Sequence, residues 1–345
     1  MKLLLRQAVG IDVAQNELVV ALGRMDEAFL VDIYAHKTFS NSASGFEGLV
    51  DWVSSRTEPG IGLRFVMEAT GVYHEQLAHF LAGKGLEVSV VVPNKISNFF
   101  RTLEVKTVTD KTASETLTRF GLERKLDSWK PPHSLYRRIR HLTRERDQVI
   151  ADRTVAKNQL HAELAGFEPL ASSVKRINQK IALLDKQVKE ITTELMALVK
   201  RDEEIYRQVR LMSSLPGIGL LTAATILGET NGFELIRNKR QLTSYAGLDV
   251  REKQSGTSIR SKPTISKKGN SYLRKAMHLP ALAAIRTDER FKAIFTRLVG
   301  KHGIKMKAVV AVQRKLLEMT YVLFKHNSTY DKSYLHNSPL PQETL

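Results

Sequence analysis

The sequence contains no cysteine, and this absence excludes several kinds of chemistry at once. A chain without cysteine cannot form disulfide bonds, bind zinc through thiolates or use a cysteine nucleophile. It also lacks an uncharged apolar run approaching the ~18 residues that a membrane span needs. Residues 1–6 show no signal-peptide pattern. We therefore expect a protein of the cytoplasm that does not enter a membrane.

Two familiar patterns of enzyme motifs are missing as well. The ten histidines show no H-E-x-x-H or other paired metal spacing. The chain also lacks a G-x-x-x-x-G-K-[ST] loop for nucleotide phosphates. These absences argue against a zinc hydrolase and against an ATPase.

Positive charge is concentrated in the C-terminal part. The chain has 53 Lys and Arg against 36 Asp and Glu, a formal net charge of +17. Residues 206–345 carry a net charge of +15, which leaves +2 for residues 1–205. Eleven basic and two acidic residues lie between Arg237 and Lys275. This density suits the neutralisation of nucleic-acid phosphates better than an ordinary solvated basic surface.

The first part of the chain alternates predicted strands and helices. Apolar and β-branched runs predict strands at residues 9–13, 18–22, 29–34, 63–68 and 87–92. Ser44 and Glu47 form a capping-box pattern that predicts a helix start, and a second helix is expected over 73–83. This order predicts an RNase H-like (RuvC-like) α/β domain over residues 1–130, which ends near Pro131.

Three acidic residues stand at informative places in this domain. Asp12 lies in an apolar strand, Glu68 ends a later strand, and Asp110 opens a helical stretch. A carboxylate in an apolar strand is costly to desolvate unless it has a partner. Acids delivered in this order hold divalent metal against a phosphodiester in RNase H-like nucleases. We therefore predict a Mg²⁺ site at these three acids, with three unrelated surface acids as the alternative.

The middle segment, residues 131–205, is predicted to be helical and elongated. Apolar residues alternate at spacings of three and four at Val174, Ile177, Ile181, Leu184, Val188, Ile191, Leu195 and Leu198. This repeat predicts a coiled-coil seam, and a helix over 135–164 would pair with it as an antiparallel hairpin. The seam can close within one chain or between two chains, because both arrangements bury the same stripe.

The third segment, residues 206–325, is predicted to be mostly helical and to bind nucleic acid. Near the start of this segment, the residues from Leu215 read L-P-G-I-G-L. This sequence matches a helix-hairpin-helix turn that would present backbone N–H groups to a phosphate. A plain inter-helix turn is the alternative. The residues predicted to contact nucleic acid are Gly217, Gly219, Arg251, Lys253, Arg260, Lys262, Lys267, Lys268, Arg274 and Lys275. Residues 326–345 are polar and contain proline, which predicts a disordered tail.

Ser255 is a candidate nucleophile inside the basic segment. Gly256 follows it and leaves the hydroxyl sterically open, and basic residues flank it on both sides. Nearby cations would stabilise a pentacovalent phosphorane during attack on a phosphodiester. From these residues alone, an ordinary Ser-Gly turn explains the pattern equally well.

The ordered set of motifs resembles the DEDD-type insertion-sequence transposases, which are the bridge-RNA-guided recombinases. The resemblance spans about Val9 to Lys325. It rests on GIDV at 10–13, MEATG at 67–71, TD at 109–110, LPGIG at 215–219, YAGL at 245–248, SG at 255–256 and ISKKGN at 265–270.

This resemblance implies a RuvC-like domain with a DEDD acid set and a transposase domain with an essential serine, acting together on DNA. Asp12, Glu68 and Asp110 match the first three acids, and Ser255 matches the serine. The resemblance also implies a homo-oligomer, dimer or tetramer, with a composite site that joins the acids of one protomer to the serine of another. Its cofactors would be Mg²⁺ and a noncoding guide (bridge) RNA that pairs with target and donor DNA. Such a protein would act at the bacterial nucleoid.

Ala113 departs from the family pattern, which has Asp three residues after the third acid. Alanine cannot bind a cation, and Ser114 and Glu115 are displaced around the helix. The acid set is therefore D-E-D-A, which predicts an impaired recombinase. Two alternatives remain: a RuvC-type junction nuclease that uses water, and a catalytically inactive scaffold that binds RNA and DNA.

Overall fold

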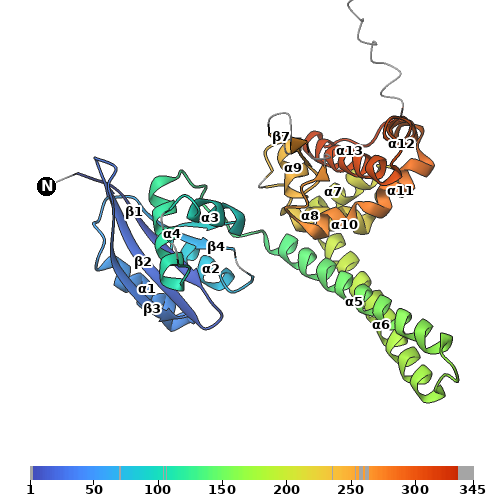
Figure 1. Ribbon diagram of the computed structural model, residues 1–345, viewed down its shortest axis with the longest axis horizontal. Helices are drawn as coiled ribbons and strands as arrows, with labels where there is room; N and C mark the ends of the chain where they lie inside the picture. Colours follow the sequence, from blue (N-terminus) through green and yellow to red (C-terminus); the bar gives the residue numbers. More distant parts are fainter. Residues whose placement is uncertain are drawn as a thin grey trace, which may run out of the picture. The chain divides into compact units, whose positions relative to one another are not determined.

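The computed structural model describes residues 3–69, 71–103, 105, 107–234, 236–252, 254–255, 259–260 and 264–332. The chain divides into two compact units, Met1–Pro131 and Pro132–Leu345 (Figure 1). Within the described ranges, no helix is both long enough and apolar enough to cross a membrane.

The first unit is built on a five-stranded mixed sheet with the order β3-β2-β1-β4-β5. Its strands are β1 (Leu4–Val13), β2 (Glu17–Asp26), β3 (Val31–Ser40), β4 (Leu63–Glu68) and β5 (Glu87–Val91). The first three pair antiparallel, and β4 runs parallel to both β1 and β5. Its helices are α1 (Ala43–Ser54), α2 (Glu75–Gly83), α3 (Pro93–Phe100) and α4 (Asp110–Glu123). This topology is RNase H-like and confirms the predicted fold of the N-terminal domain.

The two faces of the sheet are covered by different helices. Val9 and Ile11 of β1 belong to an apolar cluster that includes Phe46 of α1 and Leu77 of α2. Gly10, which lies between them, faces α4 instead. Because side chains alternate along a strand, every second residue of β1 from Gly10 onward points to the α4 face.

Gly10 allows α4 to lie directly on the sheet. A Cβ atom at Gly10 would lie 2.1 Å from the Ser114 carbonyl oxygen and 2.3 Å from the Thr118 nitrogen. The Thr118 hydroxyl accepts a hydrogen bond from the Gly10 N–H at 3.0 Å and lies 3.0 Å from the Ala21 carbonyl oxygen. Gly121 repeats the close approach one turn later, where a Cβ would lie 2.7 Å from a methyl group of Val66. These contacts fix the position of α4 along β1.

One predicted helix start in this unit is wrong. The N-cap of α1 is Ser42 and not Ser44, because Ser42 has the extended backbone of an N-cap and its side chain accepts a hydrogen bond from Gly45 N–H at 3.4 Å. Pro93 follows the last predicted strand and occupies the first turn of α3.

The second unit is helical apart from short strands. Its helices are α5 (Ser134–Ala165), α6 (Ala171–Arg201), α7 (Glu203–Ser213), α8 (Leu220–Thr230), α9 (Lys239–Tyr245), α10 (Ser271–Ala276), α11 (His278–Thr287), α12 (Glu289–His302) and α13 (Lys305–His326). Between α9 and α10, β6 (Val250–Arg251) pairs antiparallel with β9 (Thr264–Ile265) and β7 (Gln254–Ser255) with β8 (Ile259–Arg260).

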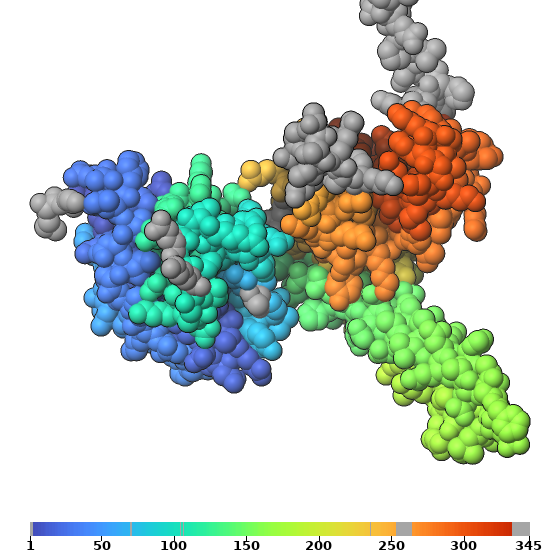
Figure 2. All heavy atoms as spheres, in the orientation of Figure 1, coloured from blue at the N-terminus to red at the C-terminus, as the bar shows by residue number. Residues whose placement is uncertain are grey.

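Helices α5 and α6 form an antiparallel hairpin that projects as an arm from the rest of this unit (Figures 1 and 2). All eight predicted seam residues of α6 are buried or half-buried, and the four buried ones are Leu184, Ile191, Leu195 and Leu198. The base of the arm shares one apolar core with the later helices, from Ile139 to Leu323. Regular coiled-coil packing and contact with a second chain remain predictions.

The expected disordered tail is wrong for its first residues. Helix α13 continues through His326, and the Tyr330 N–H donates to the Ser214 hydroxyl at 2.8 Å. The Tyr330 hydroxyl donates to the Asp288 carboxylate at 3.1 Å. An aromatic residue with two polar anchors holds this stretch on the helical unit. Residues 333–345 lie outside the described part of the chain.

The contact between Gly10 and α4 predicts a large effect from one methyl group. Gly10→Ala should lower the free energy of unfolding of the first unit by about 1–3 kcal/mol or more, because the methyl group meets backbone atoms that cannot move aside. Both tryptophans, Trp52 and Trp129, belong to this unit, so urea unfolding followed by tryptophan fluorescence reports on it alone. Gly83→Ala is the control, because a Cβ there would meet nothing within 4 Å. Equal stability of both variants would contradict the packing described here.

Candidate active site

Asp12 and Glu68 stand at the ends of neighbouring parallel strands. The register pairs Ile11 of β1 with Met67 of β4, and the two acids are the next residues on each strand. Residues opposite one another in a parallel pair share a face of the sheet. Since Gly10 packs against α4, both carboxylates lie on the α4 face, and both side chains are half-buried.

Asp110 reaches the same face from the first turn of α4. Thr109 is the N-cap, and its side chain accepts a hydrogen bond from Thr112 N–H at 3.2 Å. The Thr112 hydroxyl in turn accepts from the Thr109 N–H at 2.8 Å. This reciprocal cap fixes the start of the helix, and with it the place from which the exposed Asp110 side chain leaves the backbone.

The three acids are electrostatically coupled. Burial, followed by the negative charges of Asp110 and Glu68, raises the pKa of Asp12 to about 6, and a hydrogen bond from the Val13 backbone opposes this rise. Within the described residues, no three Asp, Glu or His side chains are arranged so that they could hold a metal ion. The three carboxylates thus interact through their charges, but they do not surround a common position for a cation. Their hard oxygen donors and mutual repulsion fit a divalent cation such as Mg²⁺.

The fourth position of the acid set carries no ligand. Ala113 is half-buried one helical turn after Asp110 and presents only a methyl group. The Ser114 hydroxyl donates to the Lys111 carbonyl oxygen at 2.8 Å, and the Glu115 carboxylate pairs with His36 of β3 at 2.8 Å. Neither neighbour therefore takes the place of a missing carboxylate.

Sequence reasoning missed the residues that position the acids. Gly10 and Thr118 hold α4 against β1, and neither has a functional group that would contact substrate. A glycine inside a strand was the available signal, because such a glycine often marks the close approach of another backbone. The partner of that glycine lies 108 residues away and has no sequence signal of its own.

Ser255 lies on a β-hairpin. Its backbone in β7 is paired with Ile259 of β8, and the neighbouring pair is Gln254 with Arg260. The side chains of Ser255 and Arg260, and the residues Lys253, Gly256 and Lys262, lie outside what the structure describes. The predicted nucleophile is therefore placed by backbone register alone, at the end of β7.

Hydrogen bonds and close packing join the two chain segments at the base of this hairpin. The Ser266 N–H donates to the Asp249 carbonyl oxygen at 2.8 Å, and the Asn270 N–H donates to the Tyr245 carbonyl oxygen at 2.7 Å. Gly247 has a φ of +66°, and a Cβ there would lie 2.7 Å from a guanidinium nitrogen of Arg274. The two motifs YAGL and ISKKGN thus contact each other and form one support for the chain between them.

The predicted nucleic-acid contacts divide into two groups. Arg251, Lys267 and Lys268 are exposed at the base of the hairpin. Arg274 donates to the Ala246 carbonyl oxygen at 2.8 Å, and Lys275 pairs with the Asp147 carboxylate at 2.6 Å. The last two cations therefore already have partners in the chain.

The predicted helix-hairpin-helix turn joins α7 to α8. Gly217 has a φ of +82° and packs on α11, where a Cβ would lie 2.3 Å from the Pro280 carbonyl oxygen. Gly219 is the exposed N-cap of α8, and a Cβ there would meet nothing within 4 Å. Packing explains the first glycine, and phosphate binding at the second remains a prediction.

The fold and the acids together define a class: an RNase H-like α/β unit with an acidic cluster on one sheet face, followed by a basic helical unit. Two family models match the chain. A DEDD transposase model of the IS110 type matches residues 9–169, and the model described as "Transposase IS116/IS110/IS902 family" matches residues 209–296. Together these matches show that both parts of the chain are similar to transposases of the IS110/IS116 type.

Beyond these two models, the chain is also similar to individual proteins. The "Pilin gene-inverting protein" of Moraxella bovis is 28% identical over 327 residues, which is 94% of this chain and 97% of that protein. The "Transposase for insertion sequence element IS1111A" of Coxiella burnetii is 22% identical over 298 residues, 77% of this chain and 78% of that protein. A solved structure of T. thermophilus RuvC in complex with Holliday junction substrate covers 33% of this chain and 90% of its own, at 11% identity and a TM-score of 0.26.

The raised pKa of Asp12 predicts a pH-dependent effect of its removal. The folded state favours the protonated acid, so this group's contribution to stability is present below about pH 4 and is lost as the pH rises to about 6. In EDTA, Asp12→Asn should therefore raise the melting temperature of the first unit at about pH 7.5 and change it little at about pH 4.

Thermal unfolding followed by tryptophan fluorescence at the two pH values measures this difference. Excess Mg²⁺ at the higher pH should stabilise the unchanged chain more than the variant, so the difference between their melting temperatures should become smaller. A gap that is the same at both pH values would show that Asp12 does not titrate as described.

Proposed function

We propose that this chain is a Mg²⁺-dependent DNA recombinase of an insertion sequence and that Ser255 attacks a DNA phosphodiester. The observation that carries the proposal is the approach of Asp12, Glu68 and Asp110 on one face of an RNase H-like sheet, where their charges raise the pKa of Asp12. The match of residues 9–169 to the model of the DEDD transposases supports it.

Each residue has a role in the proposed reaction. The Ser255 oxygen forms a bond to phosphorus as its proton passes to a base, and the bond from phosphorus to the leaving deoxyribose oxygen breaks, so that this oxygen gains a proton. A hydroxyl of a second strand then attacks the phosphoserine linkage and releases the serine. The linkage conserves the bond energy, so strands are exchanged without ATP.

The acids and the cations serve the same phosphate. Asp12, Glu68 and Asp110 would hold Mg²⁺, which would polarise the scissile phosphate and assist the leaving oxygen. Arg251, Lys253, Lys267 and other cations of the basic segment would neutralise the nucleic-acid backbone. By the family resemblance, the acids of one protomer would act with the serine of another in a homo-oligomer.

Sequence choice would be made by a guide RNA that pairs with target and donor DNA. The basic C-terminal segment suits contact with phosphates, and no zinc-finger or RNP1 pattern that reads bases is present in the sequence. Treatment of the purified protein with ribonuclease should therefore abolish site-specific DNA binding, as measured with matched and scrambled DNA in a binding assay. If the RNA-free protein still selects the same site, the protein reads DNA directly.

Ala113 makes the acid set testable. Ala113→Asp should raise Mg²⁺-dependent strand cleavage by at least roughly tenfold, equivalent to ~1.4 kcal/mol in barrier height, because it supplies a fourth charged ligand. Ala113→Asn is the matched control with the same shape and no charge. Binding of RNA and DNA should change little in either variant, since it depends mainly on the basic segment.

Three outcomes distinguish the alternatives. Full cleavage by the unchanged chain, or an equal gain with Asn, would remove the fourth-acid assignment. Cleavage without any covalent protein–DNA adduct would indicate a RuvC-type nuclease that uses water. Binding without cleavage in both the unchanged chain and the Asp variant would indicate a scaffold.

A further inference from the structure

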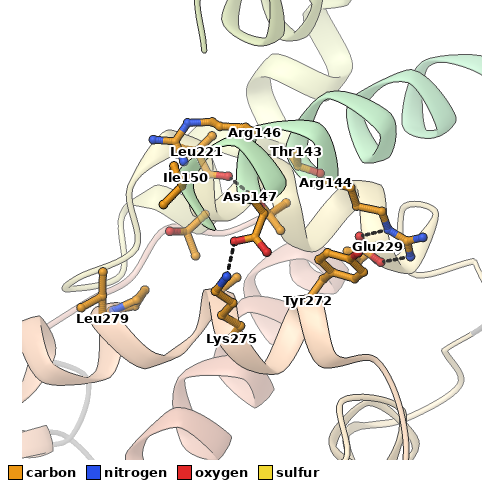
Figure 3. Close-up of a pocket in the computed structure, with 14 residues that line it drawn as sticks. Thr143, Arg144, Arg146, Asp147, Ile150, Leu221, Glu229, Tyr272, Lys275 and Leu279 are labelled. Atoms are coloured by element: carbon orange, nitrogen blue, oxygen red, sulfur yellow. Dashed lines mark hydrogen bonds and ion pairs between the residues drawn. The ribbon is translucent and has the colours of Figure 1, made fainter. Parts of the chain in front are cut away.

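Glu229 of α8 has an unusually complete set of partners for a buried acid. Its side chain is 0% exposed, and both carboxylate oxygens accept hydrogen bonds from Arg144 of α5, at 2.7 and 2.8 Å (Figure 3). The side-chain amide of Asn270 donates to one of the same oxygens at 2.6 Å. A buried carboxylate is tolerated only with such compensation, so these three groups must stay together.

Glu229 contacts both ends of the Ser255 hairpin, one through its backbone carbonyl and one through its carboxylate. Tyr245, just before the hairpin, donates its hydroxyl hydrogen to the Glu229 carbonyl oxygen at 2.9 Å. Asn270, just after the hairpin, is the N-cap of α10 and accepts from the Leu273 N–H at 2.8 Å. Its own N–H donates to the Tyr245 carbonyl oxygen at 2.7 Å. Glu229 therefore binds both ends of the segment that carries Ser255.

Arg144 extends this connection to the arm. Its guanidinium group stacks on the Tyr272 ring of α10 at 4.6 Å from the ring centre. One turn later on α5, Asp147 pairs with Lys275 of α10 at 2.6 Å. The residues of both contacts line one pocket (Figure 3). Helix α5 therefore contacts α10, the helix that follows the hairpin, at two points.

We propose that Glu229 is a positioning residue, which locks the base of the Ser255 hairpin to α8 and, through Arg144, to α5. The role in catalysis rests on the proposed serine attack. A bidentate Arg–carboxylate pair fixes direction as well as distance, so it can set the orientation in which the hairpin leaves the helical core. A nucleophile must be held close to its attack geometry, and small misplacements cost large factors in rate.

Glu229→Gln tests the lock with almost no change in volume. In glutamine an NH₂ group replaces one carboxylate oxygen, so in either orientation of the amide at least one donor of Arg144 faces another donor, and the bidentate pair is lost. Hydrogen exchange on the chain as it stands should become at least about tenfold faster at the amides of Lys267 and Asn270, while amides of α13 keep their protection. Glu204→Gln is the control, because it alters a similar bidentate pair with Arg207 on the exposed surface.

A second variant separates the hydrogen-bond pattern from simple damage. In the double variant Glu229→Gln with Asn270→Asp, the amide can donate to the new carboxylate, and its oxygen can accept from Arg144. Aspartate is also a good N-cap for α10. The double variant should therefore recover most of the exchange protection that the single variant loses.

The link to chemistry is measured by the rate of covalent protein–DNA adduct formation in the Ala113→Asp background. Glu229→Gln should lower this rate at least about tenfold and change DNA affinity by less than about threefold, and the double variant should restore it. Unchanged exchange at the hairpin base, or faster exchange with an unchanged adduct rate, would overturn the positioning role. Adducts that persist in Ser255→Ala would instead refute the proposed nucleophile, and the exchange data would still decide whether Glu229 holds the hairpin.

Discussion

The contact of α4 with the centre of β1 is the constraint on which the acid site depends. Gly10 has no side chain, so the helix backbone can lie on the strand, and Thr118 bridges the two with its hydroxyl group. Asp12 follows Gly10 by two residues, and Asp110 begins the helix. Any shift of α4 along the strand would separate these acids, because one enters from the sheet and the other from the helix. Burial raises the pKa of Asp12, and the charges of Asp110 and Glu68 add to that rise.

In the second unit, polar contacts hold the segment that carries the candidate nucleophile. There the segment with the proposed nucleophile Ser255 lies between α9 and α10, and its two ends are held by Glu229 and its partners Arg144, Tyr245 and Asn270. Apolar packing places the helices, but the directional hydrogen bonds of a buried carboxylate fix how the hairpin leaves them. In both units, buried contacts between distant residues position the segments that carry the candidate site residues.

The sequence was sufficient for the parts of this account that depend on local patterns. Alternating apolar residues predicted the sheet, the acids stood out in apolar surroundings, and the three-four spacing from Val174 predicted the long helix of the arm. Contacts between distant residues left no such pattern. Arg144 and Glu229 are 85 residues apart, and nothing near either one indicates its partner. The N-cap of α1 was predicted wrongly because Ser42 and Ser44 lie close together in the sequence. Tyr330 anchors a stretch whose composition had predicted disorder.

The most direct test of the central claim is to identify the atom that carries DNA. A suicide DNA substrate, incubated with the Ala113→Asp protein and Mg²⁺, should give a covalent adduct, and peptide mass spectrometry should find the phosphate on Ser255. Asp12→Asn in the same background should lose the adduct while DNA binding remains. A phosphate on another residue, or cleaved DNA with free ends and no adduct, would contradict a recombinase that acts through Ser255.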